Sequence, residues 1–274
     1  EDEVYEFQAA EVAGQDEDEY EAISSLGLRL SAADENSASR IPLAPSRVDA
    51  NDIACENVGF RCVPFGLTHE TLDIAVFDYG EKSVDRCAAQ KRSDLVQFMT
   101  AFAHVVSLME GYRVTLLDIG QLFAGKPQFC DAATRKPEQA YAYLLHLLES
   151  SCTAEGIEFI MITGTAAFFN ALAYDDALRV KEWLKSLTPE DGIEVLVCDL
   201  AGDTTCVHDD WFKAHSTNRD GLWIGPGVDT QTMINANYNP RVLQASQMDE
   251  GLGYWIEAGD SQLVHLVQKE KEDE

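Results

Sequence analysis

The chain has 274 residues, of which 46% are hydrophobic, so it is long and apolar enough to bury a core. Its 48 acidic and 20 basic residues give a formal net charge of −28. This charge argues against sequence-independent binding to DNA or RNA, which needs Lys and Arg at the phosphates, and it disfavours contact with anionic lipid. We therefore expect no nucleic-acid partner and no direct membrane contact.

The ends of the sequence carry no predicted leader or membrane span. No window offers 18 continuous apolar residues, and no charged-then-apolar stretch opens the chain. The sequence begins at Glu1 rather than at a methionine, so we expect a fragment of a longer protein or a processed product.

Residues 1–48 are predicted to be an acidic segment followed by a linker. Residues 1–22 contain ten acids and no base, and residues 31–48 are rich in Ser, Ala, Asn and Pro. We expect residues 49–268 to form one domain and residues 269–274 to form a charged tail. Mobility is predicted at residues 1–3, 14–20 and 269–274.

From residue 60 onward, apolar runs alternate with helical patterns. Strands are predicted near 72–77, 83–89, 113–118, 157–163, 193–199 and 222–224, and helices near 94–110, 137–151 and 175–187. A closing hairpin is predicted to turn at Ala258-Gly259-Asp260. Unbroken apolar strands that alternate with helices indicate an α/β domain: a mainly parallel, helix-covered sheet with the antiparallel hairpin on one edge.

The seven cysteines do not predict a disulfide framework or a zinc site. Their number is odd, no two form a Cys-x-x-Cys pair, and most lie in apolar surroundings; they are residues 55, 62, 87, 130, 152, 198 and 206. We expect reduced thiols. His208-Asp209-Asp210 has the residue types of a metal site, but an acidic helix N-terminus explains it better, and no metal is expected.

A phosphate loop is the first chemistry to look for between a strand and a helix. The motif G-x-x-x-x-G-K-[ST] would precede the 94–110 helix, but its positions hold Ala89, Asp94, Leu95 and Val96. Asp94 would also repel a phosphate at the helix N-terminus. We therefore expect no working phosphate loop and no catalytic residues.

A shifted register does not restore the motif. It places Arg92-Ser93 at the Lys-Ser pair, but Arg86 and Lys91 then replace both glycines. The acid that would hold magnesium is missing as well, because Thr163 ends the strand where the acid belongs. Asp118 ends another strand, and capping of the following loop is its better interpretation.

Several motifs together resemble one family. Residues 221–239 (GLWIGPGVDTQTMINANYN) are similar to a Trp-Ile-Gly-x-Gly…Gln run, here Trp223, Gly225, Gly227 and Gln231, after the dipeptide Trp211-Phe212. Four other segments support this similarity by their order and spacing: YEFQAA (5–10), RIPLAP (40–45), VPFGLTHETLDIAVFDY (63–79) and the closing hairpin. The chain thus resembles the FtsK/SpoIIIE superfamily of RecA-like ATPases, and in particular the last ATPase-like domain of the EssC/EccC proteins of type VII secretion.

This resemblance implies a cytoplasmic module of a membrane-anchored secretion motor. It implies as partners the other ATPase domains of the same chain and small helical-hairpin substrates or their C-terminal signals. The chain departs from the family at its Gly-Lys-Ser/Thr loop and its strand-end acid, so the resemblance does not imply ATP hydrolysis by this domain, and we expect no cofactor.

Three functions remain open from the sequence. The first is a catalytically inactive module that recognises an export-signal peptide or regulates the neighbouring ATPase domains, with Trp211 and Phe212 as candidate surface anchors for the peptide. The second is a weakly active ATPase that binds ATP and magnesium with Arg92, Ser93 and Asp118 as replacements. The third is a domain that only packs against its neighbours.

Overall fold

The computed structural model describes residues 45, 47–54, 58–59, 61–150, 156–203, 206–229, 231–237 and 250–268. The chain divides into two units, Glu1–Leu43 and Ala44–Glu274, and all described residues belong to the second. The mobility predicted at both ends lies outside the described residues, and the domain boundaries at residues 48 and 268 stay predictions.

Strands and helices alternate through most of the unit. In chain order they are β1 (Val48–Asp49), α2 (Ala50–Ala54), β2 (Cys62–Thr68), β3 (Ile74–Asp78), β4 (Val84–Ala89), α3 (Arg92–Leu108), β5 (Tyr112–Asp118), β6 (Ala132–Thr134), α4 (Pro137–Glu149), β7 (Ile157–Thr163), α5 (Thr165–Ala171), α6 (Tyr174–Ser186), β8 (Ile193–Leu200), α7 (Asp210–Lys213), β9 (Gly221–Ile224), β10 (Leu252–Glu257) and β11 (Asp260–Gln268). Short 3₁₀ turns cover Pro189–Asp191 and Cys206–His208.

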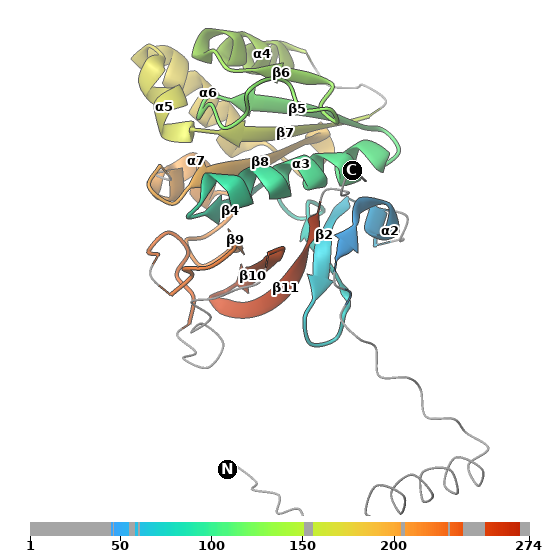
Figure 1. The fold of residues 1–274 in the computed structure, drawn as a ribbon. Helices are drawn as coiled ribbons and strands as arrows, with labels where there is room; N and C mark the ends of the chain where they lie inside the picture. Colours follow the sequence, from blue (N-terminus) through green and yellow to red (C-terminus); the bar gives the residue numbers. More distant parts are fainter. Residues whose placement is uncertain are drawn as a thin grey trace, which may run out of the picture. The chain divides into compact units, whose positions relative to one another are not determined.

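The strands form one mixed sheet in the order β3-β2-β11-β10-β9-β4-β8-β7-β5-β6, with β1 beside β11 (Figure 1). The half from β9 to β6 is parallel, and the half from β3 to β9 is antiparallel. The predicted fold class is therefore confirmed. The C-terminal hairpin, β10 and β11, is not the outermost pair, because β2 and β3 extend the sheet beyond it.

Helices cover both faces of the parallel half because its strands are apolar on both sides. In β7, Phe159 and Met161 pack in the same cluster as the buried face of α3. Ile160 and Ile162 point the other way and pack with residues of α4, α5, α6 and α7. Because β4, β8, β7 and β5 run parallel to one another, their carboxyl ends lie together along one border of the sheet, which we call the carboxyl edge.

Candidate functional site at the carboxyl edge

The connection from β4 to α3 is too short to be a phosphate loop. Ala89 ends β4 and Arg92 begins α3, so only Gln90 and Lys91 lie between them. The sequence predicted the loss of both glycines, and the structure adds the loss of length. A phosphate loop needs a longer stretch of backbone to turn several N–H groups toward the anion.

The residues that replace the motif's Lys and Ser/Thr are part of the core. Leu95 has no exposed surface, and Val96 packs against the same apolar cluster. Asp94 lies in the first turn of α3, where it adds negative charge to the helix N-terminus that follows β4. This corner of the carboxyl edge is thus filled by apolar packing, with an acidic side chain at the helix N-terminus.

The structure also argues against the shifted register, which would place Arg86 at the first glycine of a phosphate loop. Arg86 lies inside β4 and is 1% exposed. Its guanidinium donates to the carbonyls of Thr217, Asp220 and Met233, and burial lowers its pKa to about 10. Arg86 therefore ties the segments before and after β9 to the sheet and is not at a loop.

Arg92 and Ser93, two of the three replacement residues of the weak-ATPase alternative, already have partners. Arg92 Nε donates to the Leu122 carbonyl at 3.0 Å and an Nη of the same side chain to the Gln121 carbonyl at 2.9 Å. Ser93 Oγ donates to Asp94 Oδ1 at 2.9 Å. Both side chains would have to leave these contacts before they could hold a nucleotide or magnesium.

Asp118, at the end of β5, caps the loop that follows it, as the sequence indicated. Its Oδ1 accepts from Leu122 N at 2.7 Å and from Thr163 Oγ1 at 2.9 Å, and its Oδ2 accepts from Phe123 N at 3.0 Å. Arg135 Nε lies 3.7 Å from Oδ2. The carboxylate is 1% exposed and has used its lone pairs on protein donors.

We expect Asp118→Asn to lower the free energy of unfolding by about 2 kcal/mol. An amide supplies one acceptor oxygen where the carboxylate supplies two, so one backbone N–H loses a charged acceptor. Urea unfolding measures the loss, with Asp203→Asn as a control, because Asp203 is exposed near the same edge. Equal stability of Asp118→Asn and wild type would show that the cap contributes nothing.

Asp199, at the end of β8, is a buried acid that the sequence analysis did not single out. Its Oδ1 accepts from Gly164 N at 2.5 Å, its Oδ2 accepts from the Thr165 hydroxyl, and burial raises its pKa to about 6. Gly164 has φ +66°, and a Cβ there would lie 2.5 Å from Gly120 N. The apolar run that precedes Asp199 in β8 was the available signal in the sequence. The partners of Asp199, Gly164 and Thr165, come from another loop.

The residues of the Trp-Ile-Gly-x-Gly…Gln run have structural contacts within this chain. Trp223 is 1% exposed, and its indole N–H donates to the Pro226 carbonyl at 3.1 Å. Gln231 accepts from the N–H groups of Met233 and Ile234 and donates to two carbonyls, so it closes the loop after β9. Gly225 has φ +76°, and a Cβ there would lie 2.7 Å from Asp94 Oδ2. The motif thus packs against the start of α3.

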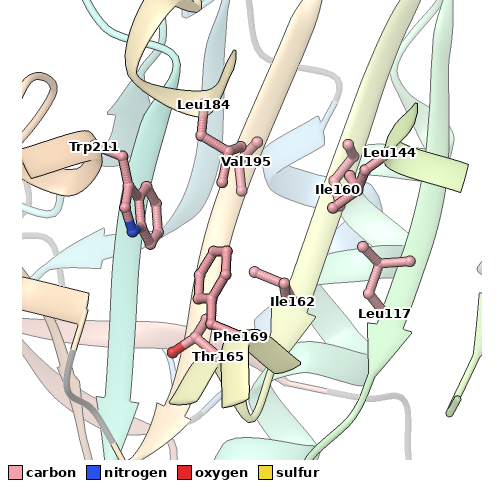
Figure 2. A pocket seen from close by; sticks show the side chains of 9 residues that line it. All are labelled: Leu117, Leu144, Ile160, Ile162, Thr165, Phe169, Leu184, Val195 and Trp211. Atoms are coloured by element: carbon pink, nitrogen blue, oxygen red, sulfur yellow. The ribbon is translucent and has the colours of Figure 1, made fainter. Parts of the chain in front are cut away.

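The prediction that Trp211 and Phe212 are surface peptide anchors is wrong. They are 2% and 0% exposed, because the short helix α7 turns both aromatic rings toward the sheet while its polar neighbours face solvent. Figure 2 shows Trp211 beside Phe169 and Val195 at an apolar slot. The slot has a volume of about 10 Å³, enough for about one water molecule and too small for a peptide side chain.

The described residues contain no cluster of three or more His, Cys, Asp or Glu side chains arranged to hold a metal ion. Asp209 precedes α7 as its N-cap residue and Asp210 lies in its first turn, as expected for an acidic helix start. Cys87, Cys130, Cys198 and Cys206 are free thiols. None of the described helices combines the length and the apolar character that crossing a membrane requires.

Comparison with known proteins gives matches only among solved structures. No protein-family model and no curated protein matches the chain. The cytoplasmic domain of EssC superposes with a TM-score of 0.64 at 15% identity, over 93% of this chain and 55% of that one. The fold predicted from the sequence motifs is confirmed by this match. The chain has the RecA-like fold of the EssC/EccC ATPase domains.

Two further structures share this EssC/EccC-like fold. ATPases 2 and 3 of Thermomonospora curvata EccC, in complex with a signal sequence peptide, match with a TM-score of 0.60 at 12% identity over 92% of this chain and 48% of that one. The pCW3 conjugation coupling protein TcpA, with ATPγS, matches with a TM-score of 0.57 at 11% identity, over 90% of this chain and 82% of that one. The chain therefore spans about half the length of the secretion ATPase structures.

Proposed function

We propose that this chain is an ATPase-like module of a type VII secretion motor that does not hydrolyse ATP and instead takes part in recognising the export signal of a secreted protein. The parent protein would be anchored in the membrane, with this module on the cytoplasmic side. Its partners would be the other ATPase domains of the parent and small helical-hairpin substrates or their C-terminal signals.

The two-residue connection between β4 and α3 is the observation that carries this proposal. The fold of an ATPase is kept, while the loop that would hold phosphate is missing and Thr163 stands where a magnesium-binding acid would lie. Losing each charge-stabilising group commonly raises a reaction barrier by several kcal/mol. The net charge of −28 further separates this chain from translocases whose cargo is DNA.

The EccC structure that shares this fold supports the recognition part of the proposal, because it was solved in complex with a signal sequence peptide. The two alternatives remain distinct. The weakly active ATPase would need Arg92 and Ser93 to leave their present partners. A domain that only packs against its neighbours would bind neither nucleotide nor peptide.

Calorimetric titration of the 274-residue chain with the C-terminal signal peptide of a co-encoded secreted protein tests the proposal. We expect saturable binding with a dissociation constant in the micromolar range, as for weak, regulated peptide recognition, and none with a scrambled peptide. A folded chain, verified by circular dichroism, that releases no binding heat would overturn the recognition part of the proposal and leave the weakly active ATPase and the packing role.

A further inference from the structure

A groove of about 510 Å³ lies toward the amino ends of the parallel strands, opposite the carboxyl edge. Lys82 and Asp220 line it, and these residues precede β4 and β9, so they lie where those parallel strands begin. Its floor and walls come from β2, β3, β10 and β11, and Trp255 is part of its lining. The volume is within the range of ordinary ligand sites.

The charges around the groove are strongly unbalanced. Among the described residues that line it, four carry carboxylates and only Lys82 carries a positive charge; the four are Asp78, Glu81, Asp220 and Glu257. Asp220 is held in place, because its Oδ1 accepts from Ala258 N at 2.7 Å and its Oδ2 accepts from Thr217 N at 3.1 Å. Glu81 and Glu257 are exposed at the rim and are available to an incoming charge.

The groove already holds one ammonium group from the chain itself. Lys82 Nζ lies 5.9 Å from the centroid of the Trp255 ring, within the distance of a cation–π contact. The same atom lies 2.8 Å from Asp85 Oδ2. Asp85 is completely buried, and Lys82 is its ion-pair partner. Burial raises the pKa of Asp85 while Lys82 acts to lower it, so the ammonium group of Lys82 favours the charged carboxylate at this end of the groove.

Trp255 is fixed in position by the core. Its ring lies 5.3 Å from Phe65 and 5.4 Å from Phe77, measured between centroids. Its remaining surface is partly open and lines the groove. A rigid indole beside several carboxylates is suited to the long alkyl stem and charged end of Lys or Arg.

We propose that this groove is a docking site for a polypeptide segment that presents Lys or Arg side chains. A basic side chain lies along Trp255 next to Lys82, and its charge is neutralised by Glu257, Glu81 and the fixed Asp220. The proposal is independent of the proposed signal recognition, because it requires neither nucleotide nor export signal.

The test compares two double variants of the full chain with the same change in net charge. Glu81→Lys with Glu257→Lys reverses the groove rim, and Glu110→Lys with Glu182→Lys reverses two exposed charges elsewhere. The probe is a capped peptide of alternating lysine and alanine, with a glutamate–alanine peptide as its counterpart. Binding is measured by calorimetry at physiological ionic strength, and thermal unfolding verifies that every variant is folded.

We expect the lysine peptide to bind wild type and the glutamate peptide not to bind. Affinity should fall at least about tenfold in the groove variant and less than about threefold in the control variant, because only the groove variant removes contacts beyond the general attraction of an acidic protein. Trp255→Phe, which keeps an aromatic ring in the core, should weaken binding by a few-fold. Equal losses in the two double variants, or no binding to wild type, would overturn the proposal.

Discussion

Replacing Arg61 with methionine is expected to lower the free energy of unfolding by about 3–5 kcal/mol, because it leaves the carboxylate of Glu194 buried without its partner. Arg61 Nε lies 2.9 Å from Glu194 Oε1, and their side chains are 4% and 0% exposed. The Tyr112 hydroxyl is the second donor to the same oxygen, at 3.4 Å. Urea unfolding of wild type and Arg61→Met measures the effect.

The pH dependence of this loss gives a second readout. Burial raises the pKa of Glu194 from 4.5 to about 7, although Arg61 acts to lower it. The stability that protonated Glu194 contributes is therefore present below pH 4.5 and is lost as the pH rises through about 7. Without Arg61 the pKa rises further, so the cost of Arg61→Met should be larger at about pH 8 than at about pH 5.

A matched double variant separates the loss of a charge partner from the loss of packing. Arg61→Met with Glu194→Gln removes both charges, so it should recover most of the stability that Arg61→Met loses and should show little pH dependence in this window. If Arg61→Met is as stable as wild type at about pH 8, the ion pair of Arg61 and Glu194 does not stabilise the contact between the start of β2 and strand β8.

Replacing Trp223 with alanine is expected to lower the free energy of unfolding by about 3–5 kcal/mol, the usual range for removing a buried aromatic side chain. Trp223 packs with Tyr254, Ile256, Val228 and Ile234 in the cluster that joins the loop after β9 to the hairpin. Its indole also holds the Pro226 carbonyl. Thermal or urea unfolding measures the loss.

Trp223→Phe is the control, because it keeps most of the apolar volume and loses the hydrogen bond. We expect it to be clearly less destabilising than the alanine variant. A Trp223→Ala chain that keeps wild-type stability but loses binding to a partner would contradict the account, since it would make this motif residue a binding element and not a structural one.

The sequence predicted the parallel half of the sheet well because its signals are local. The unbroken apolar runs at β5, β7 and β8 and the periodic apolar residues of α3 identify their elements without knowledge of distant contacts. The position of the hairpin in the sheet could not be predicted from the sequence in the same way. His265 of β11 pairs with Leu67 of β2, and nothing in either segment specifies a partner so far along the chain.

The candidate site was predicted in part for the same reason. The absence of glycine and lysine before α3 at the motif positions is visible in the sequence, whereas the partners of Arg92 and Asp199 come from other loops. Trp211 and Phe212 were misplaced because their neighbours in the sequence are polar, while a single short helix turn buries both rings. The acidic groove combines residues from the β3–β4 turn, the start of β9 and the end of β10, so no local pattern marks it.

The central claim is that the chain keeps an ATPase fold but has no nucleotide site at the carboxyl edge. Titration of the chain with Mg·ATPγS tests this claim most directly. TcpA, whose matched structure was solved with ATPγS, serves as the positive control. We expect no saturable binding heat up to about 1 mM nucleotide, the upper end of common substrate affinities. Saturable, magnesium-dependent binding that Arg92→Ala abolishes would contradict the claim and favour the weakly active ATPase.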